Sequence, residues 1–123
     1  MKEPYSDTYG WESYKYTYKD KELISMRAFE PTAEVVSSMW FAPNHVRAWR
    51  KDVYKKLGGH NKSMFIADDL DLMIRTYLGS KMYHIPKTLY IYRITGYNSF
   101  IKFSEQIKRE SANLKEKYKE RLK

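Results

Sequence analysis

The sequence predicts one domain of the α/β or α+β class, and three observations favour that class. Short β-prone runs occur in both halves of the chain. Two stretches between them carry apolar residues at helical spacing, and a long charged stretch with the same spacing ends the chain. With 123 residues the chain is long enough for one core. The predicted order is strand, helix, acidic loop, helix, strand, strand, helix, which is typical of a mixed sheet flanked by helices.

Composition and charge limit the classes of partner. Apolar residues make up 42% of the chain, which is ordinary for a globular protein. The formal net charge of +8 suggests an anionic partner such as a nucleotide, a phosphorylated substrate, nucleic acid or a membrane surface. Half of that net charge lies in residues 102–123, where a solvated helix face is the simpler interpretation.

The chain has no cysteine, so disulfides and thiolate metal sites are excluded and a reducing compartment is permitted. It also lacks an apolar run of about 18 residues that could span a membrane. Its first residues have no apolar core of the kind that a signal peptide requires. We therefore expect an intracellular, cytoplasmic protein without a transmembrane segment.

The first 34 residues are rich in tyrosine. Tyr14, Tyr16 and Tyr18 alternate with polar residues, which predicts a strand with one aromatic face after a turn at Gly10-Trp11. Aromatic residues interleaved with lysine could also stack nucleobases, although an ordinary edge strand has the same pattern. Residues 21–34 predict a loop or a short helical turn that Pro31 ends.

Residues 35–57 predict a strand followed by a helix. Val35–Phe41 is β-branched and aromatic at its ends and should be a buried strand, ended by Pro43-Asn44. The next stretch should form a helix of about two turns, with Gly58 in the position that follows a helix C-terminus. A polar loop over residues 60–64 then leads to the centre of the chain. The apolar residues at helical spacing are Trp49, Val53, Tyr54 and Leu57.

A helix with an acidic first turn occupies the centre of the chain. Asp68 is the expected N-cap, and Asp69 and Asp71 fall where the helix dipole favours negative charge. Asp71 and Arg75 form an i, i+4 pair, and Gly79 should end the helix. The apolar stripe at i, i+3, i+4, i+7 and i+8 consists of Leu70, Met73, Ile74, Tyr77 and Leu78.

The remaining residues predict two strands and a helix. The strands should span residues 81–85 and 88–94, separated by Pro86-Lys87, and a turn should follow at residues 95–98. A long basic helix should run from about Ser99 to the end, so that residues 1–99 form the domain and 100–123 the C-terminal helix. Its narrow apolar seam consists of Phe100, Phe103, Ile107, Leu114 and Tyr118.

The cluster of Asp68, Asp69 and Asp71 has two interpretations. Capping and dipole compensation account for all three residues. Alternatively, a carboxylate at a helix N-terminus after a Gly-Gly loop lies at the rim of a sheet, where it could act as a general base or bind a divalent cation through oxygen. The three histidines, His45, His60 and His84, have no metal-ligand spacing, and each is more typical of a structural hydrogen-bonding residue. The sequence has no P-loop and no Gly-x-Gly-x-x-Gly.

Three blocks in order carry a resemblance to a known family. A short helix ends in Gly-Gly within residues 50–61, an Asp-Asp pair opens the helix Asp-Leu-Asp-Leu-Met-Ile-Arg within residues 67–75, and an Ile-Pro…Tyr-Arg strand pair lies in residues 83–93. Over roughly Trp40 to Arg93 the chain resembles the C-terminal, acceptor-side half of a family 2 glycosyltransferase with the GT-A fold. The resemblance implies a partial GT-A-like mixed sheet.

The resemblance also implies roles for individual residues. Asp69 matches the general base of inverting enzymes, which takes the proton of an acceptor hydroxyl as its oxygen attacks the anomeric carbon of a nucleotide sugar. Asp68 matches the acid that orients the acceptor. The implied substrate-binding residues are Gly58, Gly59 and His60 of the loop near the sugar, Arg93 near the diphosphate, and Trp40 and Asn44.

The chain departs from the family pattern in two respects. No part before Trp40 resembles the family's nucleotide-binding βαβ unit or its Asp-x-Asp metal motif. The Asp-x-Asp formed by Asp69 and Asp71 opens a helix and belongs to the base motif. No histidine follows Arg93, where some relatives carry a metal ligand. The resemblance therefore implies that any divalent cation, Mg or Mn, is held mainly by an N-terminal half supplied in cis or in trans. The tyrosine-rich residues 1–34 would then be an insert near the acceptor site.

Two other functions compete with glycosyl transfer. One is a basic nucleic-acid-binding module that uses the tyrosine strand and the lysine-rich C-terminal helix, which the acidic cluster disfavours because it would repel phosphate. The other is a non-catalytic interaction domain that assembles through the C-terminal helix.

Overall fold

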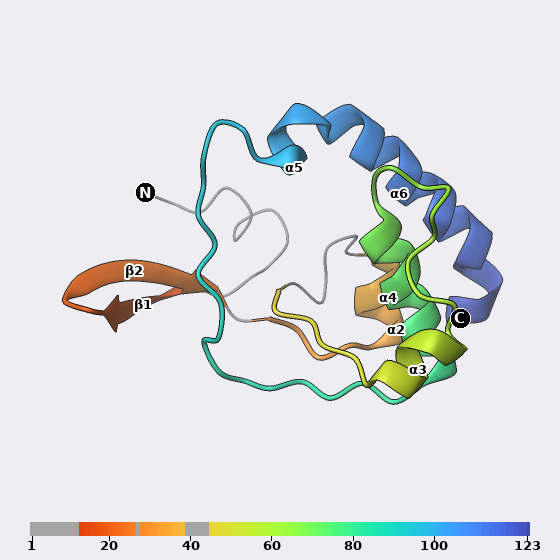
Figure 1. Cartoon of the computed structure of the whole chain (residues 1–123), viewed down its shortest axis with the longest axis horizontal. Coiled ribbons are helices and arrows are strands. Elements are labelled where there is room, and N and C mark those ends of the chain that lie inside the picture. Colours follow the sequence, from red (N-terminus) through yellow and green to blue (C-terminus); the bar gives the residue numbers. More distant parts are fainter. Residues whose placement is uncertain (1–12, 27, 39–44) are drawn as a thin grey trace.

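The computed structural model describes residues 13–26, 28–38 and 45–123 (Figure 1). This part is a mixture of helices and strands, in agreement with the predicted α+β class. No helix within these ranges is long and apolar enough to cross a membrane. The elements in chain order are β1 (Ser13–Tyr18), β2 (Lys21–Met26), α2 (Ala33–Ser38), α3 (Lys51–Lys56), α4 (Asp68–Gly79), α5 (Ser99–Lys102), α6 (Ser104–Tyr118) and the 3₁₀-helix η1 (Lys119–Leu122).

Strands β1 and β2 form an antiparallel hairpin that projects from the rest of the molecule in Figure 1. Tyr14 lies opposite Ser25, and the two-residue turn Lys19-Asp20 has positive φ at both positions, as hairpin turns of this length require. The predicted tyrosine strand is confirmed. The expectation of a loop or helical turn from residue 21 is wrong for Lys21–Met26, because ladder bonds to β1 hold these residues extended. The predicted turn at Gly10-Trp11 lies outside the described residues.

Helix α2 corrects the strand predicted at Val35–Phe41 over its described residues, 35–38. The Thr32 hydroxyl accepts a hydrogen bond from the Val35 N–H at 3.2 Å, and the Thr32 carbonyl accepts the Val36 N–H at 2.9 Å. Thr32 therefore caps the helix, and this cap outweighs the β-propensity of the two valines. Val36 is completely buried, so α2 contributes to the core. Residues 39–44, including Pro43-Asn44, lie outside the described residues.

The core lies between three helices. Helix α4 packs against α2 on one side and α6 on the other, as Figure 1 shows. The predicted helices α3 and α4 are both confirmed: Gly58 follows α3 with a φ of +84°, and Gly79 is the last residue of α4. The predicted apolar stripe of α4 faces this core, although Leu72 and Asp71 are buried as well. The buried cluster consists of Val36, Ala67, Leu70, Ile74, Leu114, Tyr118 and Leu122.

Residues 81–94 do not form the two predicted strands. They run past the base of the hairpin in Figure 1, where the Thr88 hydroxyl bonds to the Tyr14 and Ser25 hydroxyls. A strand requires a ladder of backbone hydrogen bonds, and among the described residues only β1 and β2 form one. The predicted turn at residues 95–98 is confirmed by the bond from the Asn98 N–H to the Thr95 carbonyl at 3.3 Å.

The predicted C-terminal helix is present but interrupted. Phe103, with φ −118° and ψ 24°, separates α5 from α6, and η1 completes the chain after Tyr118. Of the predicted seam, Ile107, Leu114 and Tyr118 are buried, whereas Phe100 and Phe103 are half-buried. The helix therefore packs mainly through its second half.

Candidate functional site

Asp69 combines fixed position with access to solvent. One carboxylate oxygen, Oδ2, accepts a hydrogen bond from Arg47 Nη1 at 2.7 Å, and the other, Oδ1, accepts the Leu70 N–H at 2.9 Å. The Arg47 side chain is only 11% exposed, whereas that of Asp69 is 42% exposed. A carboxylate has about four acceptor positions. Among the described residues two of these positions are occupied, so the group can still accept a proton or a hydrogen bond from a ligand.

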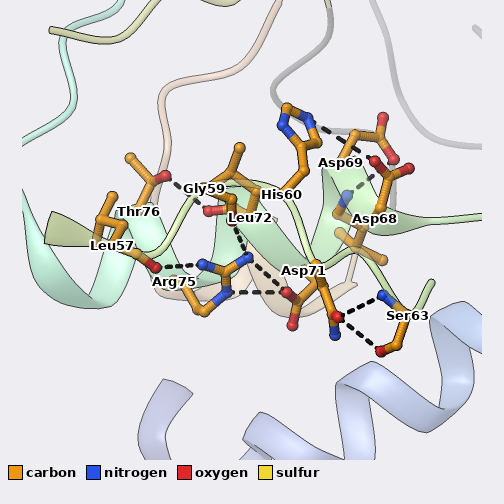
Figure 2. Close-up of polar contacts among 12 residues, drawn as sticks. Leu57, Gly59, His60, Ser63, Asp68, Asp69, Asp71, Leu72, Arg75 and Thr76 are labelled. Atoms are coloured by element: carbon orange, nitrogen blue, oxygen red, sulfur yellow. Dashed lines mark hydrogen bonds and ion pairs between the residues drawn. The ribbon is translucent and has the colours of Figure 1, made fainter. Parts of the chain in front are cut away.

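Asp68 lies beside His60, which belongs to the loop after α3 (Gly58, Gly59 and His60), called the glycine loop below. His60 Nε2 is 3.9 Å from Asp68 Oδ2, and both side chains are partly exposed. On its other side, His60 Nδ1 is 2.8 Å from the Tyr54 hydroxyl, which also accepts the His60 backbone N–H at 3.2 Å. With one proton and two lone pairs, the hydroxyl can donate to Nδ1 or accept from it, and Nε2 faces Asp68 (Figure 2).

The N-cap of α4 is Ala67, which corrects the prediction of Asp68. Ala67 adopts a left-handed conformation with a φ of +60°, and no side chain caps the helix there. Asp68 is instead the first helical residue, so all three carboxylates lie within the first turn, where they complement the dipole. A left-handed alanine is unfavourable, because its Cβ meets the following carbonyl. Burial of Ala67 in the core helps to hold this turn in place.

Asp71 belongs to a buried network and not to the exposed site. Arg75 binds Asp71 Oδ2 through Nε at 2.9 Å and through Nη2 at 2.7 Å, as predicted for the i, i+4 pair. The other oxygen, Oδ1, accepts a hydrogen bond from the Tyr118 hydroxyl at 2.9 Å. The Asp71 side chain is 3% exposed. Burial and the bond to the Asp71 carboxylate raise the pKa of Tyr118, because both favour its protonated form.

The same arginine holds the glycine loop. Arg75 donates to the Leu57 and Gly59 carbonyls, the latter at 2.7 Å, so the loop after α3 is tied to α4 (Figure 2). Gly59 has a φ of +64°, and a Cβ there would lie 2.9 Å from the Tyr54 ring. Glycine is therefore required at this position both for backbone conformation and for space. The loop consequently presents His60 toward α4.

An open hollow of about 430 Å³ lies beside the glycine loop. Gly58, Gly59 and His60 line it together with Arg75 and Tyr118. Asp68 and Asp69 do not line it. The structure therefore brings His60 close to Asp68. The hollow itself lies beside the buried Asp71 network and not beside Asp68 and Asp69.

A divalent cation does not fit the acidic turn as it stands. Asp71 is bonded to Arg75 and Tyr118, and Asp69 is paired with Arg47, so the formal Asp-x-Asp has no shared face for an ion. Across the described ranges, no group of three or more histidine and acidic residues is arranged to hold a metal ion. Any cation would need ligands from elsewhere.

Other predicted site residues are not part of this arrangement. Arg93 lies in the extended segment, where its carbonyl accepts a hydrogen bond from Asn98, and among the described residues no hydrogen bond or ion pair joins it to the acidic turn or the glycine loop. Trp40 and Asn44 lie outside those residues. Sequence reasoning missed Arg47 and Tyr54 as site residues. Arg47 acts across 22 positions, which no local pattern reveals, and the sequence pattern places Tyr54 only on the apolar face of its helix.

His45 lies close to the Arg47–Asp69 pair. Its ring stacks on Tyr90, with the ring centroids 5.1 Å apart. Partial burial, followed by the charge of Arg47, lowers the pKa of His45, and Asp69 acts in the opposite direction. The neutral imidazole is therefore favoured at this position.

Comparison of the chain with protein-family models, with curated proteins and with solved structures finds no match.

Proposed function

We propose that this chain is the acceptor-side half of an inverting family 2 glycosyltransferase of the GT-A fold, with Asp69 as its general base. The observation that carries the proposal is the state of Asp69. Its carboxylate is fixed by Arg47 and by the Leu70 N–H, is 42% exposed and keeps acceptor positions open. A group that is held in place yet accessible is suited to proton transfer.

In the proposed reaction, Asp69 takes the proton of an acceptor hydroxyl. The oxygen forms a bond to the anomeric carbon of a nucleotide sugar, and the bond from that carbon to the diphosphate oxygen breaks. Its electron pair leaves with the nucleoside diphosphate, and the anomeric configuration inverts. Asp68, with His60 3.9 Å away, orients the acceptor through hydrogen bonds. Arg47 is a positioning residue, because it acts on the reaction only through Asp69.

The donor is bound by residues other than these. The glycine loop and Arg93 would approach the sugar and the diphosphate, but the nucleotide and any divalent cation require an N-terminal half in cis or in trans. We expect the 123 residues alone to bind a nucleoside diphosphate weakly or not at all. Tight binding measured by calorimetry would contradict this division of the site.

Replacement of Asp69 by asparagine tests the proposal. The chain is combined with a nucleotide-binding half of a family 2 glycosyltransferase, and release of nucleoside diphosphate is measured in the presence of an acceptor. Asp69→Asn should reduce turnover by about 10²–10⁴-fold, because the amide cannot accept the proton. Circular dichroism should show an unchanged fold.

Asp52→Asn is the matched control, since Asp52 also lies in the first turn of a helix and is 69% exposed. It changes the charge equally and should leave turnover unchanged. Equal turnover in the two variants would contradict the role of Asp69. Absence of transfer in every complemented form would contradict the proposed function and would favour a non-catalytic interaction domain.

A further inference from the structure

Residues 88–94 have the sequence of a buried strand but the surroundings of an exposed one. Thr-Leu-Tyr-Ile-Tyr-Arg-Ile is nearly continuous in β-branched, aromatic and aliphatic residues, which is typical of a strand covered on both faces. In the structure, every residue from Leu89 to Ile94 is exposed. The apolar ones range from 47% exposure at Tyr90 to 66% at Ile94. Consecutive residues point to opposite faces of an extended chain, so side chains on both faces contact water, although the Tyr90 ring also stacks on His45.

The backbone of this segment is also without ladder partners. Among the described residues, none of the N–H groups of residues 88–94 donates to another backbone carbonyl, and the nearest such bond is that from Lys87 to Ile85, at 2.8 Å. The chain passes the hairpin, where the Thr88 hydroxyl bonds to the hydroxyls of Tyr14 and Ser25, and no backbone hydrogen bond joins the two among the described residues. An added strand could therefore pair with the backbone along residues 89–94 without displacing a ladder in the described part.

The charged residues within this segment and next to it along the sequence are all basic. No Asp or Glu occurs between Asp71 and Glu105, and Lys87 and Arg93 flank the exposed residues. A second copy of the chain would bring the same cations together, so self-association through this segment is opposed by repulsion. An acidic partner meets them favourably.

We propose that residues 88–94 are a docking strand that pairs with an open sheet edge bearing acidic side chains, on a polypeptide outside these 123 residues and not on a second copy. Strand addition satisfies the backbone and covers the apolar side chains at once. A lipid surface would cover the side chains but would leave extended backbone groups without partners. Nucleic acid would stack on the tyrosines but would leave the aliphatic Leu89, Ile91 and Ile94 in water.

This inference deepens the proposed function, because a complementing N-terminal half would supply such a sheet edge. The identity of the natural partner therefore rests on the proposed function. The segment itself can be tested without any transfer reaction. The probe is a short blocked peptide that alternates glutamate and valine, and its matched control alternates lysine and valine. Amide hydrogen exchange of the isotope-labelled chain is followed by nuclear magnetic resonance as each peptide is added.

The glutamate peptide should slow exchange of alternate amides in residues 88–94 by at least about tenfold, because pairing removes them from water. The lysine peptide should have no such effect. Proline at one of two adjacent positions, Ile91→Pro or Tyr92→Pro, should abolish the protection, since neighbouring N–H groups face opposite edges of a strand. Lys62→Pro, in the exposed turn after the glycine loop, is the control and should bind as the wild type does.

Four results would overturn the proposal. They are equal protection by both peptides, protection by neither, retention of binding in both proline variants, and protection that appears instead on self-association or on addition of phosphatidylserine vesicles or a single-stranded oligonucleotide. Loss of sugar transfer with protection intact would contradict the proposed function alone. Protection that is absent while Asp69-dependent transfer proceeds would contradict the docking strand alone.

Discussion

Similar residues are buried and bonded on the helical side of this molecule (α2, α4, α6 and η1) but exposed in its extended segment (residues 88–94). Ile74 of α4 is completely buried among α2, α6 and η1, whereas Ile91 is 57% exposed. The oxygens of Asp71 are bonded within the chain, whereas the backbone of residues 88–94 has no ladder partner among the described residues. The contrast indicates that stability resides in the helices, while the β-prone residues of the segment are available for a partner.

Truncation of an isoleucine in each region tests this contrast most strongly. Ile74→Ala should reduce the free energy of unfolding by about 2–5 kcal/mol, because it removes buried methyl groups and leaves a cavity. Ile91→Ala should change it by less than about 0.5 kcal/mol, because that side chain already contacts water. Urea denaturation measures both. A loss at Ile91 as large as that at Ile74 would mean that residues 88–94 belong to the core.

The same contrast explains which parts of the fold could be predicted. Helix α4 was predictable because the spacing of its apolar stripe, from Leu70 to Leu78, identifies the buried face of the helix from the local sequence. Strands at residues 81–85 and 88–94 were predicted from composition, but a strand exists only beside a neighbour, and composition does not say whether the neighbour is present. For Val35 and Val36, β-propensity was misleading, and the overlooked signal was Thr32, placed directly before the helix as a cap.

Prediction of the site was limited in a similar way. The acidic turn and its neighbour His60 could be identified, because both follow from motifs along the chain. The different roles of Asp69 and Asp71 could not be predicted, since they depend on contacts between residues far apart in the sequence. Arg47 bonds to Asp69 from 22 positions away, and Tyr118 bonds to Asp71 from 47 positions away. Only these contacts separate an accessible carboxylate from a buried one.

Removal of a carboxylate from the helical side and of one from the exposed hairpin should give the next largest difference. Asp71→Ala should cost about 3 kcal/mol of stability, because it leaves Arg75 and the Tyr118 hydroxyl without their partner in a buried network. Glu22→Ala removes an exposed ion pair with Lys15 on the hairpin and should cost at most about 1 kcal/mol. Thermal unfolding followed by circular dichroism compares the two. Similar losses would mean that the network contributes no more than a surface pair.

The smallest expected effect is a dependence on alkaline pH that comes from the same network. The pKa of Tyr118 is raised in the folded chain, so above its unfolded value of about 10 the native state binds more protons than the unfolded state. The contribution of this group to stability is complete below that pH and is lost as the pH rises through the folded pKa.

Urea denaturation between neutral and alkaline pH should show a smaller decline in Tyr118→Phe than in the wild type. Tyr97→Phe, in the exposed turn at 93% exposure, should decline as the wild type does. An unchanged decline in Tyr118→Phe would show that the Asp71 carboxylate does not control alkaline stability. The difference in stability between the helical side and the extended segment would then come from apolar packing alone.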